Sequence, residues 1–327
     1  MLINTYKFGF FSLILFGLIG MGRADVTKQS LVIGQTTRNY LISLPSTYSP
    51  KKRYPLLLVF HGGGGNAEQV LKTSDLLERA EKEKWILVSP FGSGRFDRVL
   101  TWNVGFGFGY AMRNKVDDIA FVRRLISSLK SSYSIDPDRV YATGISNGGM
   151  LCHMIAAHLS DQIAAIAPIV ATAGGRAKGH TQWISPPVPK QPVSVIAFNG
   201  ALDKSVPAEG GLQKSTFVRK PVELWPIDRS VGFWVEHNQC NKDAAKESNE
   251  KKQYERYIYG GGKDGSEVVH YIILNQGHAW PGGRKGFRAG DEPSQLISAN
   301  ELMFEFFKRH PKKAEPGAPA DPPEAGR

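Results

Sequence analysis

The sequence predicts an α/β fold with a mostly parallel central sheet and helices on both of its faces. Short apolar runs closed by Gly, Pro or Asn recur along the chain, and such runs are typical of strands buried on both faces of a parallel sheet. Segments with helical spacing of apolar residues separate these runs. The chain has 327 residues, 41% of them hydrophobic, which is enough for one large core. A second domain is possible but not required.

The expected strands follow one another along the chain. Residues 31–45 predict two short strands around a polar turn, because they are rich in β-branched and aromatic residues. Six apolar runs come after them: YPLLLVFHG, KWILVSPFG, RVYATGIS, IAAIAPIVA, VSVIAFNG and VVHYIILNQG. Strands alternating with helices favour parallel pairing.

Helices are expected between and after these strands. In residues 116–133 the apolar side chains recur at three- and four-residue spacing, and Asp117 and Asp118 stand in the first turn, where the helix dipole favours acids. Residues 294–310 have the same amphipathic character. Both segments therefore predict helices that cover the sheet.

The start of the chain resembles an export signal. Lys7 precedes an apolar stretch over residues 8–21, and the small-residue pattern at 22–24 is typical of a cleavage site, so we predict a signal peptide at residues 1–24. The stretch is about 14 residues long, which is short for a membrane span of about 20. The mature protein is then expected to be secreted or periplasmic, without a stable membrane anchor.

The rest of the chain is expected to form one folded domain over residues 25–310. Residues 311–327 are rich in Pro, Ala and charged residues and have little to bury, so we expect a disordered tail there. The chain carries a formal net charge of +11, but its basic residues are scattered and no basic run with interleaved aromatics indicates a nucleic-acid groove. We expect a monomer with no nucleic-acid partner.

The two cysteines limit the chemistry of the chain. Cys152 and Cys240 are too few for a disulfide framework, and they lack the C-x-x-C spacing of a metal site. An exported protein permits a bridge between them, but the sequence does not show whether they meet. No metal or organic cofactor is expected.

The sharpest chemical motif is YATGISNGGM, in which Gly144, Ser146 and Gly148 form G-x-S-x-G between a predicted strand and a predicted helix. A serine on such a tight turn is exposed at the end of the sheet, and small flanking residues allow its strained backbone. The alternative is a glycine-rich turn with an idle serine. A nucleophilic serine needs a base, and the base needs an acid to hold its tautomer.

In hydrolases with this motif the acid and then the histidine follow the serine along the chain. Asp203 comes directly after the run VSVIAFNG and is the candidate acid, although it could merely cap a turn. Asp228 is its nearest rival, but no apolar run precedes it. The run VVHYIILNQG leads to His278, the candidate base. Other histidines lie before the serine, on helices or inside a strand: His61, His153, His158, His237, His270 and His310.

An anion formed at the attacked carbonyl would need backbone N–H donors. One donor is expected from Asn147, directly after the serine, and the other from the loop VFHGGGGNAEQ. Gly63 is the first choice and Gly64 the second. The rival interpretation, a phosphate-binding loop, lacks the G-x-x-x-x-G-K-[ST] spacing.

These parts resemble a secreted esterase family that includes polyhydroxybutyrate depolymerase-like proteins and feruloyl or acetylxylan esterases, all of the α/β-hydrolase superfamily. The resemblance runs over about 250 residues and rests on HGGGGNA, WNVGFGFG, DPDRVYATGISNGGML, NGALDKSVPAEGG and GHAWPGG, among other segments. It implies an α/β-hydrolase fold and a catalytic triad of Ser146, Asp203 and His278. The family often has a Cys pair where this chain has Gly107 and Phe108, so stapling by disulfides is not implied.

The same resemblance places three further residues, Trp102, Asn103 and Trp280, around the mouth of the active site. They are expected to form an apolar pocket or to stack on a sugar, with packing under loops as the alternative. The implied function is an exported serine ester hydrolase that acts on short-chain hydroxyalkanoate esters. A feruloyl or acetylxylan esterase and a peptidase are alternatives. A non-catalytic binding protein on the same fold would have lost one of the three triad residues, and all three are present.

Overall fold

A computed structural model describes residues 25–95, 99–107, 109–213 and 222–313. The signal peptide expected at 1–24 and the tail from residue 314 onward lie outside these ranges, so both remain predictions. Within the described residues, none of the helices has the length and apolar character needed to span a membrane.

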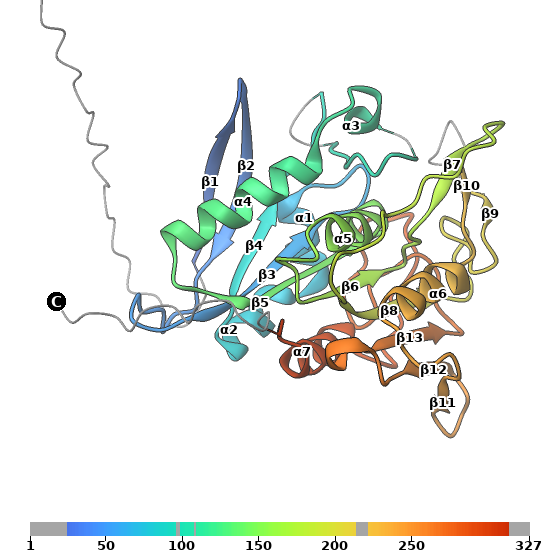
Figure 1. Cartoon of the computed structure of the whole chain (residues 1–327). Helices are drawn as coiled ribbons and strands as arrows, with labels where there is room; N and C mark the ends of the chain where they lie inside the picture. Colours follow the sequence, from blue (N-terminus) through green and yellow to red (C-terminus); the bar gives the residue numbers. More distant parts are fainter. Residues whose placement is uncertain (1–24, 96–98, 108, 214–221, 314–327) are drawn as a thin grey trace, which may run out of the picture.

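The core of the molecule is a ten-stranded sheet in the order β1-β2-β4-β3-β5-β6-β8-β13-β12-β11 (Figure 1). Strands β4, β3, β5, β6, β8 and β13 are mutually parallel, whereas the two edges of the sheet are antiparallel. The strands are β1 (Val26–Ile33), β2 (Thr36–Ser43), β3 (Tyr54–Phe60), β4 (Ile86–Pro90), β5 (Ile135–Ile145), β6 (Ala165–Ile169), β8 (Ser194–Gly200), β11 (Ala245–Ser248), β12 (Tyr254–Tyr259) and β13 (Val268–Ile273).

The hairpin and the six apolar runs expected from the sequence all form strands of this sheet. The central strands β3, β4, β6 and β8 are buried along their whole length, which explains why their sequences are continuously apolar rather than alternating. The sequence did not indicate β11 and β12, which contain charged residues and are partly or fully exposed.

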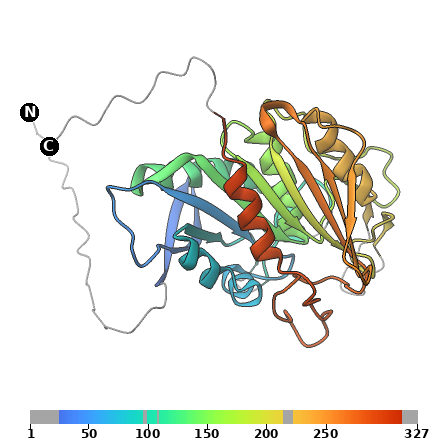
Figure 2. The same cartoon turned by 90° about the horizontal axis from the view of Figure 1, so that it is seen from below.

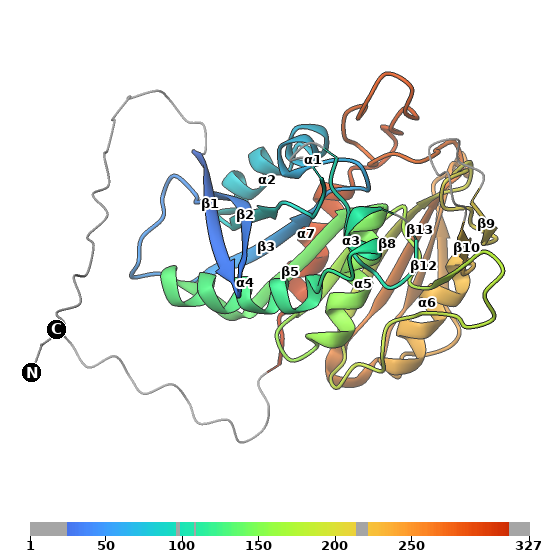
Figure 3. The ribbon, with the colours of Figure 1, turned by 90° about the horizontal axis from the view of Figure 1, so that it is seen from above.

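Helices cover both faces of the sheet, as predicted, and each face has its own core (Figures 2 and 3). One face carries α4 (Asp118–Ser132), α5 (Asn147–His158) and α6 (Ile227–His237). The other carries α1 (Ala67–Ser74), α2 (Leu76–Glu83) and α7 (Ala299–Arg309). The expected helix at 116–133 begins at its N-cap, Asp117, whose carboxylate accepts a hydrogen bond from the N–H of Ala120 at 2.8 Å.

A small antiparallel sheet of β7 (Gly175–Ala177), β10 (Val222–Leu224) and β9 (Gly211–Leu212) lies apart from the main sheet (Figure 1). Two further short helices are α3 (Tyr110–Arg113) and η1 (Lys263–Gly265).

The two cysteines do not form a disulfide in the structure: Cys152 and Cys240 are both buried and both free thiols.

Candidate active site

Four loops meet at the carboxyl edge of the parallel strands, where ligands of open α/β sheets bind. Ser146 follows β5, and the glycine run 62–65 follows its neighbour β3. Asp203 follows β8, and His278 follows its neighbour β13. Because neighbouring parallel strands end side by side, residues far apart in the sequence are brought to one place.

Ser146 lies on a strained turn between β5 and α5. Its φ of 56° and ψ of −122° are rare for a residue with a side chain. The turn is possible because its flanking glycines leave room for close approach: a Cβ on Gly144 would lie 2.7 Å from the Gly148 carbonyl, and one on Gly148 would collide with the carbonyl oxygen of Phe60. The G-x-S-x-G spacing is therefore required by packing, and it leaves Ser146 half-buried at the sheet edge.

His278 and Asp203 form a hydrogen-bonded pair. Nδ1 of His278 lies 2.7 Å from Oδ2 of Asp203, whose other oxygen accepts the N–H groups of Ser205 and Val206 at 2.7 and 2.8 Å. Because the carboxylate is an acceptor, Nδ1 carries the proton and Nε2 is left with a free lone pair. The Asp203 side chain is 1% exposed and that of His278 22%, so the acid is sheltered and the base is accessible.

A second carboxylate, that of Asp291, supports the histidine loop. Oδ2 of Asp291 accepts the backbone N–H of His278 at 2.6 Å, and the lack of a side chain on Gly277 lets Asp291 approach this closely. Asp291 was not singled out in the sequence, because it lies in a polar loop with no motif around it. Within the described residues, no hydrogen bond joins Ser146 Oγ to His278; in structures without substrate this contact is often long.

The donors expected to bind an anion differ in availability. The N–H of Gly64 donates to the carbonyl of Leu100 at 2.8 Å and is therefore occupied. Gly63 is exposed, and its N–H has no acceptor among the described residues. The N–H of Asn147 belongs to the first turn of α5, where no acceptor exists within the helix. The structure thus favours Gly63 over Gly64.

His61 supports the glycine loop and does not face the triad as a base. Its Nε2 accepts the N–H of Gly92 at 3.0 Å, so Nδ1 carries the proton and lies 2.8 Å from the carbonyl of Gly62. Burial lowers the pKa of His61 to about 4, because the charged imidazolium is poorly solvated there. A neutral, fixed histidine therefore holds both the first residue of the glycine run and the loop after β4.

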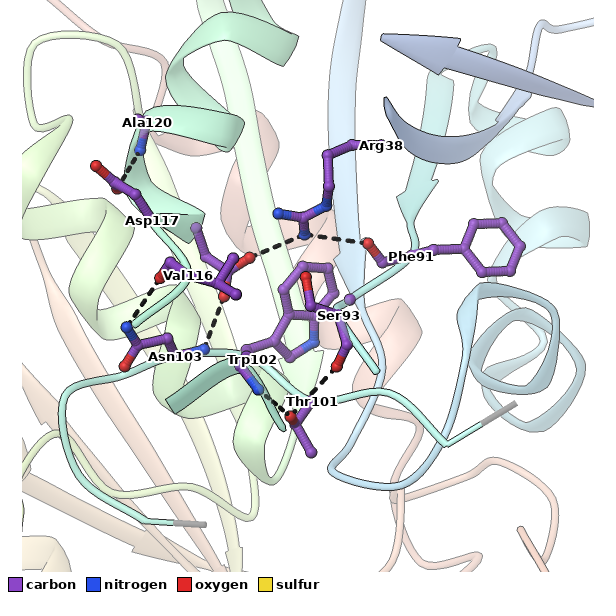
Figure 4. Close-up of polar contacts among 12 residues, drawn as sticks. Arg38, Phe91, Ser93, Thr101, Trp102, Asn103, Val116, Asp117 and Ala120 are labelled. Atoms are coloured by element: carbon purple, nitrogen blue, oxygen red, sulfur yellow. Dashed lines mark hydrogen bonds and ion pairs between the residues drawn. The ribbon is translucent and has the colours of Figure 1, made fainter. Parts of the chain in front are cut away.

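Trp102 and Asn103 make structural hydrogen bonds (Figure 4), which favours the alternative of packing under loops over contact with substrate. Trp102 is fully buried, its Nε1–H donates to the carbonyl of His61 at 2.9 Å, and its backbone N–H donates to Oδ1 of Asn147 at 2.8 Å. The Asn103 side chain donates to the carbonyl of Val116 at 2.8 Å and accepts from the N–H of Gly105. These bonds hold the loop against the start of α5.

A buried ion pair lies behind this loop. Arg38 Nη2 is 2.8 Å from Oδ1 of Asp118, and Oδ2 of Asp118 accepts the N–H of Asn103 at 2.7 Å. The guanidinium also lies 3.9 Å from the centre of the Phe121 ring, and Figure 4 shows Arg38 reaching the carbonyl of Phe91 as well. Burial raises the pKa of Asp118, and the charge of Arg38 opposes that rise.

Trp280 is also buried, at 2% exposure, and its Nε1–H donates to Oδ1 of Asn300 at 3.0 Å. Its indole packs in the core on the α7 side of the sheet. No face of this ring is available to stack on a sugar. Trp280 therefore fixes the loop that carries His278 by packing under it.

A pocket next to Ser146 contains residues that the sequence did not single out. Four buried apolar side chains and one glutamine line it together with Ser146 and Asn147: Phe106, Met150, Gln213, Val222 and Leu224. These residues come from the loop before α3, from α5 and from the small sheet. Phe106 and Met150 lie in the segments WNVGFGFG and YATGISNGGM. No motif marks Gln213, Val222 or Leu224, because their place beside Ser146 depends on how the small sheet is placed. Within the described residues, no group of three or more His, Cys, Asp or Glu is arranged to hold a metal ion.

Fold and site together define a member of the α/β-hydrolase superfamily. The chain belongs to the esterase family, since residues 33–255 match the family described as "Putative esterase". This confirms the resemblance noted from the motifs.

Two curated relatives are similar to this chain. Feruloyl esterase B of Piromyces equi is 27% identical over 259 residues, which cover 76% of this chain and 44% of that protein. The chain thus spans less than half the length of that relative. A protein of Nocardia uniformis subsp. tsuyamanensis, named putative esterase NocK, is 26% identical over 304 residues, covering 86% of this chain and 82% of the other.

Solved structures support the fold. The acetyl xylan esterase from Aspergillus awamori has a TM-score of 0.56 at 13% identity and covers 86% of this chain and 99% of its own. A ferulic acid esterase from Anaeromyces mucronatus has a TM-score of 0.53 at 15% identity, covering 81% and 88%. At such identities the likeness concerns the fold alone, which is the α/β-hydrolase fold.

Proposed function

We propose that the protein is a serine carboxylic-ester hydrolase in which Ser146 is the nucleophile, His278 the base and Asp203 the acid. The observation that carries this proposal is the position of Ser146: it stands on a strained turn at the same sheet edge as the Asp203–His278 pair. The family assignment supports an esterase, and the geometry supports a serine as its nucleophile.

In the proposed mechanism, Ser146 gives its proton to Nε2 of His278 while Oγ attacks the ester carbonyl carbon. The N–H groups of Gly63 and Asn147 bind the resulting oxyanion, and in another enzyme one such donor contributes about 2.7–4 kcal/mol. The tetrahedral intermediate collapses when His278 protonates the leaving alcohol, which leaves an acyl group on Ser146. Water, deprotonated by the same histidine, then releases the acid and restores the serine.

Two acyl classes are candidates. The names of the curated relatives favour feruloyl or acetylxylan esters, whereas the apolar side chains beside Ser146 favour a short hydroxyalkanoyl group, of the kind found in polyhydroxybutyrate. A panel of methyl ferulate, acetylated xylan, 3-hydroxybutyrate oligomers and the polymer separates these classes. Cleavage of the 3-hydroxybutyrate oligomers and the polymer alone would exclude a feruloyl esterase.

We also propose that the protein is exported by residues 1–24 and acts outside the cytoplasm as a monomer. The proposal rests on the composition of that segment. Mass spectrometry of the mature protein is expected to find Asp25 near its N-terminus, and size-exclusion chromatography with light scattering tests the monomer.

The test of the reaction is hydrolysis of p-nitrophenyl acetate and butyrate by the mature protein. Wild type is expected to turn over both esters, and Ser146→Ala to lose turnover while keeping its circular dichroism spectrum. If Ser146→Ala still hydrolyses these esters, Ser146 is not the nucleophile. Absence of turnover in wild type would favour the non-catalytic binding protein.

A further inference from the structure

Gln213 presents an unused hydrogen-bond acceptor in the pocket beside Ser146. Its Oε1 is buried and has no hydrogen-bond partner among the described residues, and the residue lines the same pocket as Ser146 and Asn147. A buried carbonyl oxygen without a donor is rare in folded proteins and calls for an explanation. No other side-chain atom of that lining is left buried and unpaired.

The orientation of the Gln213 amide is fixed by its other atoms. Its Nε2 donates to the carbonyl of Ser205 at 2.9 Å, and its backbone N–H donates to the carbonyl of Val222 at 3.0 Å. Exchanging Oε1 and Nε2 would place two carbonyl oxygens against each other, so the amide nitrogen must face Ser205. Oε1 is thereby held as the free acceptor.

The other side chains of the wall leave this acceptor unpaired. Nδ2 of Asn147 donates instead to the carbonyl of Trp102 at 3.2 Å, and no hydrogen bond joins Ser146 Oγ to Oε1 among the described residues. Phe106, Met150, Val222 and Leu224 have no side-chain donor that could reach it. A ligand that brings an O–H group into the pocket would gain a hydrogen bond at a site that is already desolvated, whereas a ligand without one would leave Oε1 unpaired. Sites of this kind discriminate strongly against analogues that lack the donor.

The proposed mechanism decides which half of the ester enters the pocket. The leaving alcohol takes its proton from His278, and His278 is not among the residues that line this pocket. The alcohol therefore leaves on the His278 side of Ser146. The acyl group is then expected on the side of Ser146 where the pocket with Gln213 opens.

We propose that Gln213 is a specificity-determining residue whose Oε1 accepts a hydrogen bond from a hydroxyl group on the acyl part of the substrate. This inference rests on the proposed function and extends it to the substrate class: hydroxylated acyl groups are preferred over the same groups without the hydroxyl. Both hydroxyalkanoyl and hydroxycinnamoyl esters carry such a hydroxyl, and the experiment separates them.

The experiment measures kcat/KM on two matched pairs of esters that differ in the hydroxyl alone. One pair is ethyl 3-hydroxybutyrate and ethyl butyrate; the other is methyl ferulate and methyl 3-methoxycinnamate. Wild type is expected to prefer the hydroxylated member of at least one pair. Gln213→Met, which keeps the length of the side chain but has no strong acceptor, is expected to reduce that preference about tenfold.

Within a pair, the ratio of the two kcat/KM values separates loss of the hydrogen bond between substrate and Gln213 from a general structural effect of the substitution. Loss of the hydrogen bond to Ser205 could disturb the loop of Asp203, but that would slow both members of a pair equally. Gln295→Met is the matched control: this exposed glutamine also donates its Nε2 to backbone carbonyls, those of Gly283 and Pro293, and its substitution is expected to leave the ratio unchanged. If Gln213→Met does not fold, Gln213→Asn withdraws the acceptor by one methylene and should also lower the ratio.

The inference is overturned if Gln213→Met keeps the wild-type preference, or if wild type shows no preference in either pair. These outcomes differ from failure of the proposed function, which would appear as no cleavage of any ester, p-nitrophenyl butyrate included. In that case the inference would fall with the function on which it rests.

Discussion

His278 and Asp203 meet across the ends of two neighbouring parallel strands, with Nδ1 2.7 Å from Oδ2. Close approach of the two loops requires Gly200 at the end of β8, because a Cβ there would lie 2.6 Å from the carbonyl oxygen of Gly277. The sheet thus positions the acid and the base together, and a single hydrogen bond determines which nitrogen of the histidine can accept a proton.

Asp203→Asn is expected to lower kcat by a factor on the order of 10³–10⁴ with little change in folding. An amide can still accept the N–H groups of Ser205 and Val206, but its NH₂ group would favour a proton on Nε2 of His278, the wrong tautomer for a base. Steady-state hydrolysis of p-nitrophenyl butyrate measures the effect. Asp228→Asn is the control, because Asp228 is exposed in the first turn of α6. A wild-type kcat in Asp203→Asn would show that another residue is the acid of the triad.

Substitution of Gly148 by alanine is expected to destabilise the protein by about 1–3 kcal/mol and to slow catalysis. The added Cβ would collide with the carbonyl of Phe60 and lie 2.5 Å from that of His61, which displaces α5 and Ser146 with it. Gly232→Ala is the matched variant: Gly232 lies in the interior of α6 with nothing within 4 Å, so alanine should stabilise by about 0.5–1 kcal/mol. Urea unfolding compares the two, and equal stability would contradict the packing argument.

Much of the fold and of the candidate site could be predicted from the sequence because the evidence for them is local. Buried parallel strands are continuously apolar, and a loop that follows each one reaches the same edge of the sheet. That rule, together with the G-x-S-x-G motif and the order of the three residues along the chain, predicted Ser146, Asp203 and His278 as neighbours. The structure brings Asp203 and His278 into contact.

What could not be predicted depends on tertiary packing. Trp102 and Trp280 were expected at the site because the family resemblance places their segments around its mouth, yet a loop residue can be buried under its own loop, as both are. Gln213 follows a two-residue strand, β9, that no periodicity marks. Arg38 and Asp118 are 80 residues apart, and charged residues in a strand and at a helix start are usually solvated, so nothing in the sequence indicated a buried pair.

Stability is expected to fall steeply at mildly acidic pH, because His61, His153 and His270, the most deeply buried histidines of the described residues, are neutral. Burial lowers the pKa of His61 and His270 to about 4 and that of His153 to about 3, whereas an unfolded histidine has a pKa of about 6.5. Between about pH 6.5 and pH 4 the unfolded chain binds protons that the folded chain excludes. These histidines therefore contribute fully to the free energy of unfolding above pH 6.5. As pH falls through this window, each histidine lowers that free energy by about 1.4 kcal/mol per pH unit.

Urea unfolding at pH 7, 6 and 5 measures this slope, and His270→Gln should reduce it by about 1.4 kcal/mol per pH unit. A glutamine amide can keep the hydrogen bond to Oδ1 of Asn199, which His270 makes at 3.2 Å, without a titratable ring. The exposed His180 provides the control variant, His180→Gln. An unchanged slope in His270→Gln would show that this histidine is protonated in the folded protein.

Loss of Arg38 is expected to be the most damaging of these changes to stability. Arg38→Met would leave the carboxylate of Asp118 buried without its counter-charge, which typically costs about 3–5 kcal/mol. Activity should fall as well, because Asp118 holds Asn103 and the adjacent Trp102 holds the side chain of Asn147. The double variant Arg38→Met/Asp118→Leu removes both charges and should recover part of the lost stability.

The control for this prediction is a pair that is equally close but exposed. Lys246 and Glu255 are 2.8 Å apart on the edge strand β11 and its neighbour β12, with side chains 53% and 32% exposed. Pairs in such settings contribute little. Lys246→Met should therefore leave the midpoint of urea unfolding near that of wild type. If Arg38→Met is tolerated as well as Lys246→Met, Asp118 must be protonated in the folded protein, and the loop that holds Asn147 is then supported by hydrogen bonds rather than by a buried ion pair.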